Sequence, residues 1–270
     1  MMQPPQLIVC DVDGTLLTSD FTVLPATRDA LLRAHEAGTQ IALASGRPPV
    51  GLQRVADRAG LPRDGMVLFG WNGSCLIDAM TGQTLWSKTI ENDLYAELVN
   101  HARRFPVSPL VPHAAHVYTE SPDAYMISVE TGENGTEAVQ VADITRIPVP
   151  VHKLMFSGPP EQLREVADEL AAPFADRLEF AFSFSFCFEA TALGVNKGTA
   201  LLDHCGRSGI AVERTVAFGD NQNDVDLLRV AGLGIAMGNA VGQAKEAADE
   251  VTADNNSNGI AQALERWFPA

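Results

Sequence analysis

Short apolar runs alternate with amphipathic helical patterns in the first third of this 270-residue chain. Residues 7–10, 41–44 and 66–69 have the length and composition of buried strands. Between them, residues 26–37 place alanine and leucine side chains on one helical face, and a second helical pattern ends near Ala59. Strand–helix–strand repetition with connections this short predicts parallel pairing, and therefore an α/β sheet.

The last third of the chain shows the same alternation, so we expect it to complete the same sheet. Helices are predicted over about 197–204, from the GDNQND segment (219–224) to about 230, over 241–248 and over about 258–267, and strands over 215–218 and 234–236. Residues 1–82 and 189–270 are therefore predicted to form one Rossmann-like core domain with a parallel sheet.

Residues 83–188 have a different pattern and are predicted to form an inserted α+β domain on an antiparallel sheet. The expected helices cover 91–104 and 160–171, and the expected strands cover 115–119, 124–129, 151–157 and a pair within 178–189. In that pair phenylalanine occupies every second position from 180 to 188, which predicts one buried face and a turn near 183–185.

Composition and charge exclude several classes of partner. The chain carries 19 Lys and Arg against 34 Asp and Glu, a net charge of −15, and no basic run interrupts that acidity. Nucleic acid and anionic membrane surfaces are therefore not expected as partners. Four cysteines without a CxxC pair predict neither a disulfide framework nor a structural zinc site. The N-terminal segment lacks the pattern of a signal peptide and no apolar stretch reaches about 18 residues, so a cytoplasmic protein is expected.

Two carboxylates directly follow the first predicted strand. Asp11 and Asp13 stand at positions i and i+2, so both side chains leave the strand end on the same side. Ligands of open α/β sheets bind at the carboxyl ends of the strands. A plain turn would explain Gly14 but not two acids, and a calcium loop fails because Thr15 and Thr22 occupy positions that require acids.

Three more polar segments stand at strand ends or helix starts. Ser45-Gly46-Arg47 can bind an anion through a hydroxyl and a glycine N–H, although Ser-Gly is also an ordinary loop dipeptide. Lys197 lacks the spacing of a P-loop and taken alone would be a surface lysine. The segment 219–224, GDNQND, contains a suitable helix N-cap, but capping does not explain two acids and two amides together.

All four segments, in this order, resemble the motifs of the haloacid dehalogenase superfamily of phosphotransferases. DVDGT is similar to its first motif, Ser45 to the second, Lys197 to the third and GDNQND to the fourth. Asn72-Gly73, GVNKGTAL and ADNNSNGIA resemble its Cof-type (class IIB) phosphatases, and the insert resembles their C2-type cap. One departure, Asp226-Leu227 where Pro-Met is frequent, lies outside the chemistry.

The resemblance implies a role in catalysis, in metal binding or in orienting other groups for each of four acidic residues. Asp11 would be the nucleophile, forming an aspartyl-phosphate, and Asp13 would protonate the leaving oxygen and then activate water. The Asp11 and Asp220 carboxylates and the Asp13 carbonyl would hold Mg²⁺, which prefers oxygen ligands. Asp224 would orient a metal-bound water or Lys197.

The resemblance also implies a phosphoryl-binding set. Its expected members are Ser45, Gly46, Lys197 and Asn223. Together with Mg²⁺, the Lys197 ammonium would make the electrostatic potential at the site positive although the protein as a whole is acidic. Arg47 would reach the substrate or brace its loop, and Asn72-Gly73 would act as a hinge or contact the substrate.

The expected activity is therefore Mg²⁺-dependent hydrolysis of small phosphomonoesters, either sugar phosphates or phosphorylated cofactors. A phosphomutase and a non-catalytic ligand-binding protein on the same fold are the alternatives. The inserted domain would select the leaving group, with His113, His116 and Glu130 as first candidates. No motif in the insert specifies the substrate, and none specifies an oligomeric state.

Overall fold

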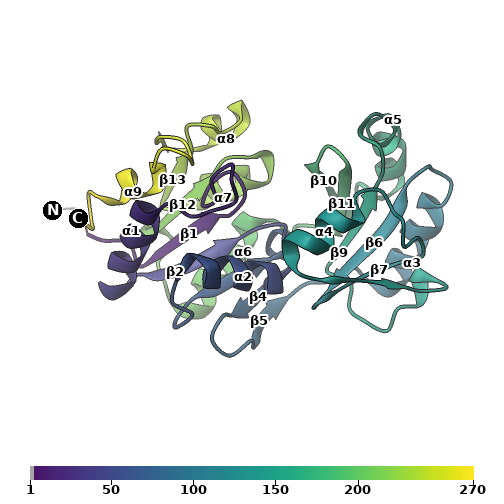
Figure 1. Cartoon of the computed structure of the whole chain (residues 1–270), viewed down its shortest axis with the longest axis horizontal. Coiled ribbons are helices and arrows are strands. Elements are labelled where there is room, and N and C mark those ends of the chain that lie inside the picture. Colours follow the sequence, from purple (N-terminus) through teal and green to yellow (C-terminus); the bar gives the residue numbers. More distant parts are fainter. Residues whose placement is uncertain (1–2) are drawn as a thin grey trace. The chain divides into compact units, whose positions relative to one another are not determined.

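The computed structural model describes residues 3–270, and they divide into two compact units. The core unit contains the residues up to Ser45, Leu52–Trp86 and Asn196–Ala270, and the insert unit contains Gly46–Gly51 and Ser87–Val195. The sequence-based boundaries at 82/83 and 188/189 remain predictions of where one functional domain gives way to the other. Figure 1 shows both units.

Within the described residues, the core unit is built on an eight-stranded sheet with the order β14-β13-β12-β1-β2-β3-β4-β5. The strands from β14 to β3 pair in parallel, and this parallel pairing was predicted for β1, β2, β3, β12 and β13. Strand β4 runs antiparallel to β3, and β4, β5 and β14 were not predicted. The bounds are β1 (Leu7–Asp11), β2 (Gln40–Ala44), β3 (Val67–Gly70), β4 (Cys75–Asp78), β5 (Thr84–Ser87), β12 (Thr215–Gly219), β13 (Leu233–Ala236) and β14 (Glu250–Val251).

Helices cover both faces of this sheet because successive strand residues point to opposite sides. Ile8 of β1 packs in one apolar cluster with helices α1, α2 and α9, and Leu7 packs in another with α6 and α7. Both faces of β1 are therefore buried, as its continuous apolar sequence predicts. The helices are α1 (Pro25–Glu36), α2 (Pro49–Ala59), α6 (Lys197–Ser208), α7 (Val225–Val230), α8 (Gly242–Ala247) and α9 (Gly259–Leu264).

The insert unit holds a six-stranded sheet with the order β10-β11-β9-β6-β7-β8 among the described residues. Its pairs are antiparallel, as predicted, except that β7 and β8 run parallel. Apolar side chains of α3 and α5 pack with Leu154 and Phe156 of β9. The elements are α3 (Asn92–Ala102), β6 (Ser108–His113), β7 (His116–Thr119), α4 (Ile127–Asn134), β8 (Glu137–Gln140), β9 (Lys153–Ser157), α5 (Pro160–Ala171), β10 (Leu178–Phe184) and β11 (Cys187–Ala192).

The predicted strand over 124–129 is wrong. Met126 has a left-handed backbone with φ 58°, which ends any extended run, and the helix α4 begins at the next residue. Ala124 and Ile127 are both buried in one cluster at a spacing of three residues, which suits a turn leading into a helix rather than a strand. Strands β6 and β8 were not predicted.

The alternating phenylalanines form the predicted pair of strands, but their predicted burial is only partly correct. Phe188 is 6% exposed and packs in the insert core, whereas Phe182 and Phe184 are 40% and 43% exposed. They lie on β10, which is the edge strand of the sheet, near the tip of the hairpin. The end of the hairpin therefore extends beyond the packed core, and its turn lies at 185–186.

Candidate active site

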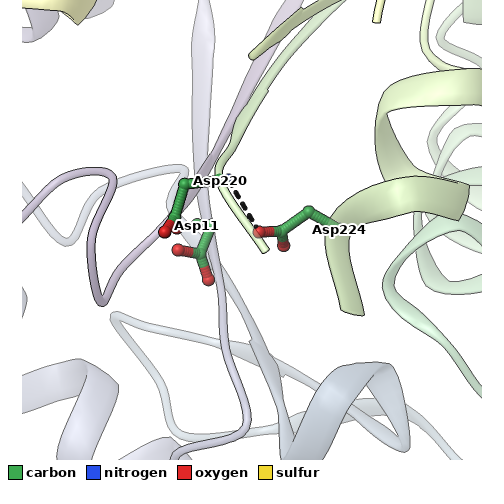
Figure 2. A group of neighbouring side chains, drawn as sticks. All are labelled: Asp11, Asp220 and Asp224. Carbon is green, nitrogen blue, oxygen red and sulfur yellow. Dashed lines mark hydrogen bonds between the residues drawn. The ribbon is translucent and has the colours of Figure 1, made fainter. Parts of the chain in front are cut away.

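Three aspartates from two segments of the chain meet at the carboxyl edge of the core sheet. Asp11 is the last residue of β1, and Asp220 follows β12, the parallel neighbour of β1. Asp224 ends the short 3-10 helix Gln222–Asp224. One carboxylate oxygen from each lies within 4.8 Å of the others. Figure 2 shows the Asp11 and Asp220 side chains next to each other, with Asp224 reaching toward them.

Lys197 neutralises part of this charge. Its Nζ donates to Asp11 Oδ1 and to Asp224 Oδ1, each at 2.6 Å, and its side chain is fully buried. Burial alone would lower the pKa of Lys197, but the carboxylates of Asp11 and Asp224 raise it above its usual value. The lysine is the first residue of α6, and Asn196 caps that helix by accepting from Thr199 N–H. Because the Asn196 cap defines where α6 begins, it also defines the position of Lys197.

Asp224 closes the loop that follows β12. Its Oδ2 accepts the N–H groups of Asp220 at 2.9 Å and Asn221 at 3.0 Å, and Figure 2 marks the first of these bonds. A Cβ at Gly219 would lie 2.5 Å from Asp224 Cβ, so a glycine is needed there. Since Lys197 occupies Oδ1, both oxygens of Asp224 are engaged by the protein.

The loop after β1 holds the side chain of Asp220, whereas Asp224 binds its backbone N–H. Thr15 Oγ1 donates to Asp220 Oδ1 at 2.9 Å. Gly14 has φ +82°, and a Cβ there would lie 2.5 Å from Asp220 Oδ2. Burial, reinforced by the negative charge of Asp224, raises the pKa of Asp220 to about 6. A raised pKa means that the site resists holding all of its carboxylates ionised without a compensating cation.

The surroundings of Asp11 disfavour an ionised carboxylate. Burial raises its pKa well above the usual value, and the charge of Asp224 adds to the effect, although Lys197 opposes it. Its Oδ2 is buried and accepts no hydrogen bond from the described residues. A buried carboxylate oxygen without a donor is costly unless a cation or substrate engages it.

Asp13 lies on the compact loop that follows β1. The loop is closed by the Leu16 and Leu17 N–H groups, which donate to the carbonyls of Asp11 and Val12 at 3.2 and 2.9 Å. Asp13 is partly exposed and forms a bridge with Leu17, and its carboxylate is not part of the three-aspartate cluster. Its predicted acid–base role remains a prediction.

Ser45 and Asn223 come together through Asn72. Ser45 is buried at the end of β2, beside β1, and its carbonyl accepts the Asn72 N–H at 2.9 Å. Asn223 Nδ2 donates to Asn72 Oδ1 at 3.1 Å. The sequence marked Asn72 as a hinge or a substrate contact and gave no sign of this bond.

Gly46 begins the segment Gly46–Gly51, which belongs to the insert unit. Its carbonyl accepts Lys153 Nζ at 2.8 Å, and Lys153 also pairs with Glu189 at 2.7 Å in the interior of the unit. Arg47 is 9% exposed. We did not predict the Lys153–Glu189 pair, although single charged residues within two apolar strand patterns were visible. The phosphoryl-binding role of the Gly46 N–H remains a prediction.

The selectivity candidates also lie in the insert unit. His113 and His116 are paired across β6 and β7, and the His113 ring stacks on that of His152 with centroids 6.4 Å apart. Burial lowers the pKa of His113, and it lowers that of His152 to about 4. Glu130 Oε1 accepts Asn134 Nδ2 at 3.0 Å on α4. Among the described residues, the three aspartates are the one group of three or more acidic, His or Cys side chains close enough to share a metal ion.

Comparison with known proteins agrees with this architecture. Residues 8–264 match the family model of haloacid dehalogenase-like hydrolases. The chain is 30% identical over 273 residues to an HMP-PP phosphatase of Serratia proteamaculans, covering 97% of this chain and 95% of that protein. A haloacid dehalogenase-like hydrolase from Bacteroides thetaiotaomicron superposes with a TM-score of 0.89 at 30% identity, covering 98% and 100% of the two chains. TM0651 from Thermotoga maritima gives 0.85 at 26% identity, covering 97% of both.

This chain thus has the framework of a hydrolase: acidic residues and a buried lysine lie at the carboxyl edge of a parallel sheet. The chain belongs to the haloacid dehalogenase-like hydrolase family and is a phosphatase of that family. No helix within residues 3–270 combines the length and hydropathy needed to cross a membrane.

Proposed function

We propose that the protein is a Mg²⁺-dependent hydrolase of small phosphomonoesters and that Asp11 forms an aspartyl-phosphate intermediate. The observation that carries this proposal is the surroundings of Asp11. It is buried between Lys197 and two further aspartates, and its Oδ2 accepts no hydrogen bond from the described residues. Such an oxygen is suited to bind a cation or to attack phosphorus.

The donor set fits Mg²⁺, which binds one or two carboxylates and keeps several waters. Asp11 and Asp220 would hold the ion with the Asp13 carbonyl, and when bound it would neutralise charge on the phosphoryl oxygens. Asp224 would not be a direct ligand, because Lys197 and two backbone N–H groups already engage its oxygens. The raised pKa values of Asp11 and Asp220 support the need for a cation here.

The chain's own residues then carry the two half-reactions. Asp11 attacks phosphorus, the bond from phosphorus to the leaving oxygen breaks, and the Asp13 carboxyl group gives its proton to that oxygen. In the second half, the Asp13 carboxylate takes a proton from water, which attacks phosphorus. Inorganic phosphate leaves and the Asp11 carboxylate is restored.

Lys197 would hold the phosphoryl group together with Ser45, Gly46 and Asn223. An ammonium has three N–H donors, and Asp11 and Asp224 accept two of those of Lys197, so one is available for a phosphoryl oxygen. This arrangement would let a protein of net charge −15 bind an anion.

The substrate we propose is a small phosphorylated metabolite, either a sugar phosphate or a phosphorylated cofactor. Relatives named HMP-PP phosphatases support a small phosphorylated molecule, so HMP-PP belongs in the first panel of substrates. The insert unit would act as the cap that selects among leaving groups, because the phosphoryl group is common to all of these substrates.

The test is phosphate release by the purified protein from sugar phosphates, phosphorylated cofactors, HMP-PP and p-nitrophenyl phosphate, with Mg²⁺ or with EDTA. We expect hydrolysis only with the metal, and a fall of several orders of magnitude for Asp11→Asn. Near-normal activity of Asp11→Asn would overturn the nucleophile assignment. Appearance of an isomeric sugar phosphate without free phosphate would instead identify a phosphomutase.

A further inference from the structure

The turn that follows β3 holds three successive residues in the left-handed backbone region. Trp71, Asn72 and Gly73 have φ values of 50°, 57° and 92°. Asparagine and glycine tolerate such angles, but tryptophan rarely adopts them, and the strain at Trp71 persists only where the surrounding structure enforces it. Trp71–Gly73 lies in the core unit, and its contacts suggest what the strained conformation achieves.

The first contact is with Ser45. The Asn72 N–H donates to the Ser45 carbonyl at 2.9 Å, and the Ser45 N–H donates to Phe69 O at 3.0 Å. Both backbone groups of Ser45 are thus bound to β3 and the turn after it. This double attachment holds the Ser45 backbone in place at the carboxyl edge of the sheet.

The second contact is with Asn223. Its Nδ2 donates to Asn72 Oδ1 at 3.1 Å, which links residues 151 positions apart in sequence. The bond fixes which end of the Asn223 amide carries the donors and uses one of its two N–H groups. The other N–H keeps a defined direction as a result.

The third contact is with the start of α6. A Cβ at Gly73 would lie 2.7 Å from both Asn196 O and Ala200 Cβ, so the turn approaches the helix too closely for any residue but glycine. Lys197 is the first residue of that helix. One turn therefore touches the three segments of the core unit that carry Ser45, Lys197 and Asn223.

We propose that Trp71–Gly73 is the positioning element of the phosphoryl-binding site and that Asn72 is a positioning residue acting through Asn223. Asn72 need not touch the reacting atoms, because its carboxamide orients the amide that does. This inference rests on the proposed function, which assigns phosphoryl binding to Ser45, Lys197 and Asn223.

Asn72→Gly is the direct test, because glycine accepts the left-handed backbone and keeps the N–H that binds Ser45. The substitution removes the Oδ1 atom that accepts from Asn223 Nδ2. We expect the KM for p-nitrophenyl phosphate and the Ki for inorganic phosphate to rise together by about 3- to 10-fold, the size of one net hydrogen bond. The thermal midpoint and the Mg²⁺ concentration for half-maximal activity should stay at wild-type values.

Asn258→Gly is the matched control. Asn258 is a left-handed asparagine with φ 59° in the same unit, and it precedes α9 outside the proposed site. The same substitution there should leave KM and Ki within about twofold. An equal rise of Ki in both variants would overturn the proposal, since it would reflect loss of a left-handed asparagine in general.

A double-mutant cycle with Asn223→Ala tests the route of the effect. If Asn72 acts through Asn223, Asn72→Gly should add less than about twofold in the Asn223→Ala background. Independent, multiplicative effects would overturn the positioning role, and so would unchanged KM and Ki in Asn72→Gly. If Asp11→Asn is inactive, either of these two results would overturn the positioning role and leave the proposed function intact. An active Asp11→Asn protein would instead overturn the proposed function.

Discussion

The Lys197 ammonium lies 2.6 Å from Asp11 Oδ1, although 186 residues separate the two in sequence. The same nitrogen binds Asp224, so one buried cation compensates two buried carboxylates. Removing one partner of a buried ion pair is far more costly than the net worth of the pair, because it leaves an uncompensated charge in the interior. This relationship links the stability of the core unit to the chemistry proposed for it.

Lys197→Met should therefore reduce both stability and activity. In EDTA we expect the free energy of unfolding to fall by about 3 to 5 kcal/mol, because Asp11 and Asp224 lose their counter-charge. Urea unfolding measures this loss, and activity should fall for every substrate by a similar factor. Lys245→Met is the control: Lys245 Nζ donates to the Gly238 carbonyl at 2.7 Å and forms no ion pair with the described residues, so a loss of about 1 kcal/mol is expected. Equal losses in the two variants would contradict the ion-pair argument.

Asp220 should control the metal requirement. Asp220→Ala removes one of the two carboxylates proposed to hold Mg²⁺, so the concentration for half-maximal activity should rise by at least about tenfold. Ca²⁺ should bind and inhibit, because its larger and looser coordination shell misplaces the reacting groups. Titration of activity with each metal after EDTA treatment measures both effects. A variant with an unchanged Mg²⁺ requirement would rule out this ligand.

Asp13 should matter most for poor leaving groups. Asp13→Asn cannot donate a proton, so hydrolysis of alkyl phosphates should fall by about 10²- to 10⁴-fold. p-Nitrophenyl phosphate should be partly spared, because p-nitrophenolate leaves without protonation. Rapid mixing should then show a burst of p-nitrophenol, since the activation of water in the second half-reaction is still impaired. Equal losses for both substrates, without a burst, would argue against Asp13 as the acid.

The stability of the insert unit should depend on pH through His152. Burial lowers its folded-state pKa to about 4 from 6.5, so the folded protein binds the proton less readily than the unfolded chain. The resulting stabilisation is present above pH 6.5 and is lost as the pH falls toward 4. Between pH 7 and pH 4.5 the loss should be about 2 to 3 kcal/mol.

His152→Phe removes that titration while keeping an aromatic ring. The difference in urea-unfolding free energy between pH 7 and pH 4.5 should be smaller in this variant than in the wild type. His35→Phe, on α1 of the core unit, is the control for the exchange of a histidine for phenylalanine outside the insert unit. An identical pH dependence in His152→Phe and the wild type would show that this ring does not carry the effect.

The sequence was informative wherever local pattern decides structure. Asp11, Ser45 and Asp220 each follow an apolar run, and the parallel sheet places those strand ends side by side. The sequence was uninformative where the alignment of neighbouring strands determines which side chains meet. Lys153 and Glu189 stand on neighbouring strands and pair only because β9 and β11 align them.

Other features were missed because apolar periodicity carries no information about them. Met126 turns left-handed before α4, which no apolar pattern reveals. The bond from Asn223 to Asn72 depends on a side-chain amide whose direction is set after the strands have assembled. The exposure of Phe182 depends on β10 being an edge strand, which follows from sheet order rather than from periodicity.

The last prediction concerns selectivity and divides labour between the two units. The residues proposed to hold the phosphoryl group in the core unit contact only what all phosphomonoesters share, so they cannot discriminate among leaving alcohols. Discrimination must come from elsewhere, and the polar side chains of the insert unit are the candidates. Replacing His113, His116 or Glu130 with alanine should change the relative kcat/KM among substrates.

The same three variants should keep p-nitrophenyl phosphate hydrolysis within about tenfold, or about 1.4 kcal/mol, because this small substrate offers little for a remote contact to bind. Ser45→Ala should instead lower every substrate by a common factor, since it acts on the shared phosphoryl group. Running one substrate panel on both groups of variants separates the two roles. Insert variants that lowered all substrates equally would refute the division, because a residue that reads the leaving alcohol must act unequally on alcohols of different shape.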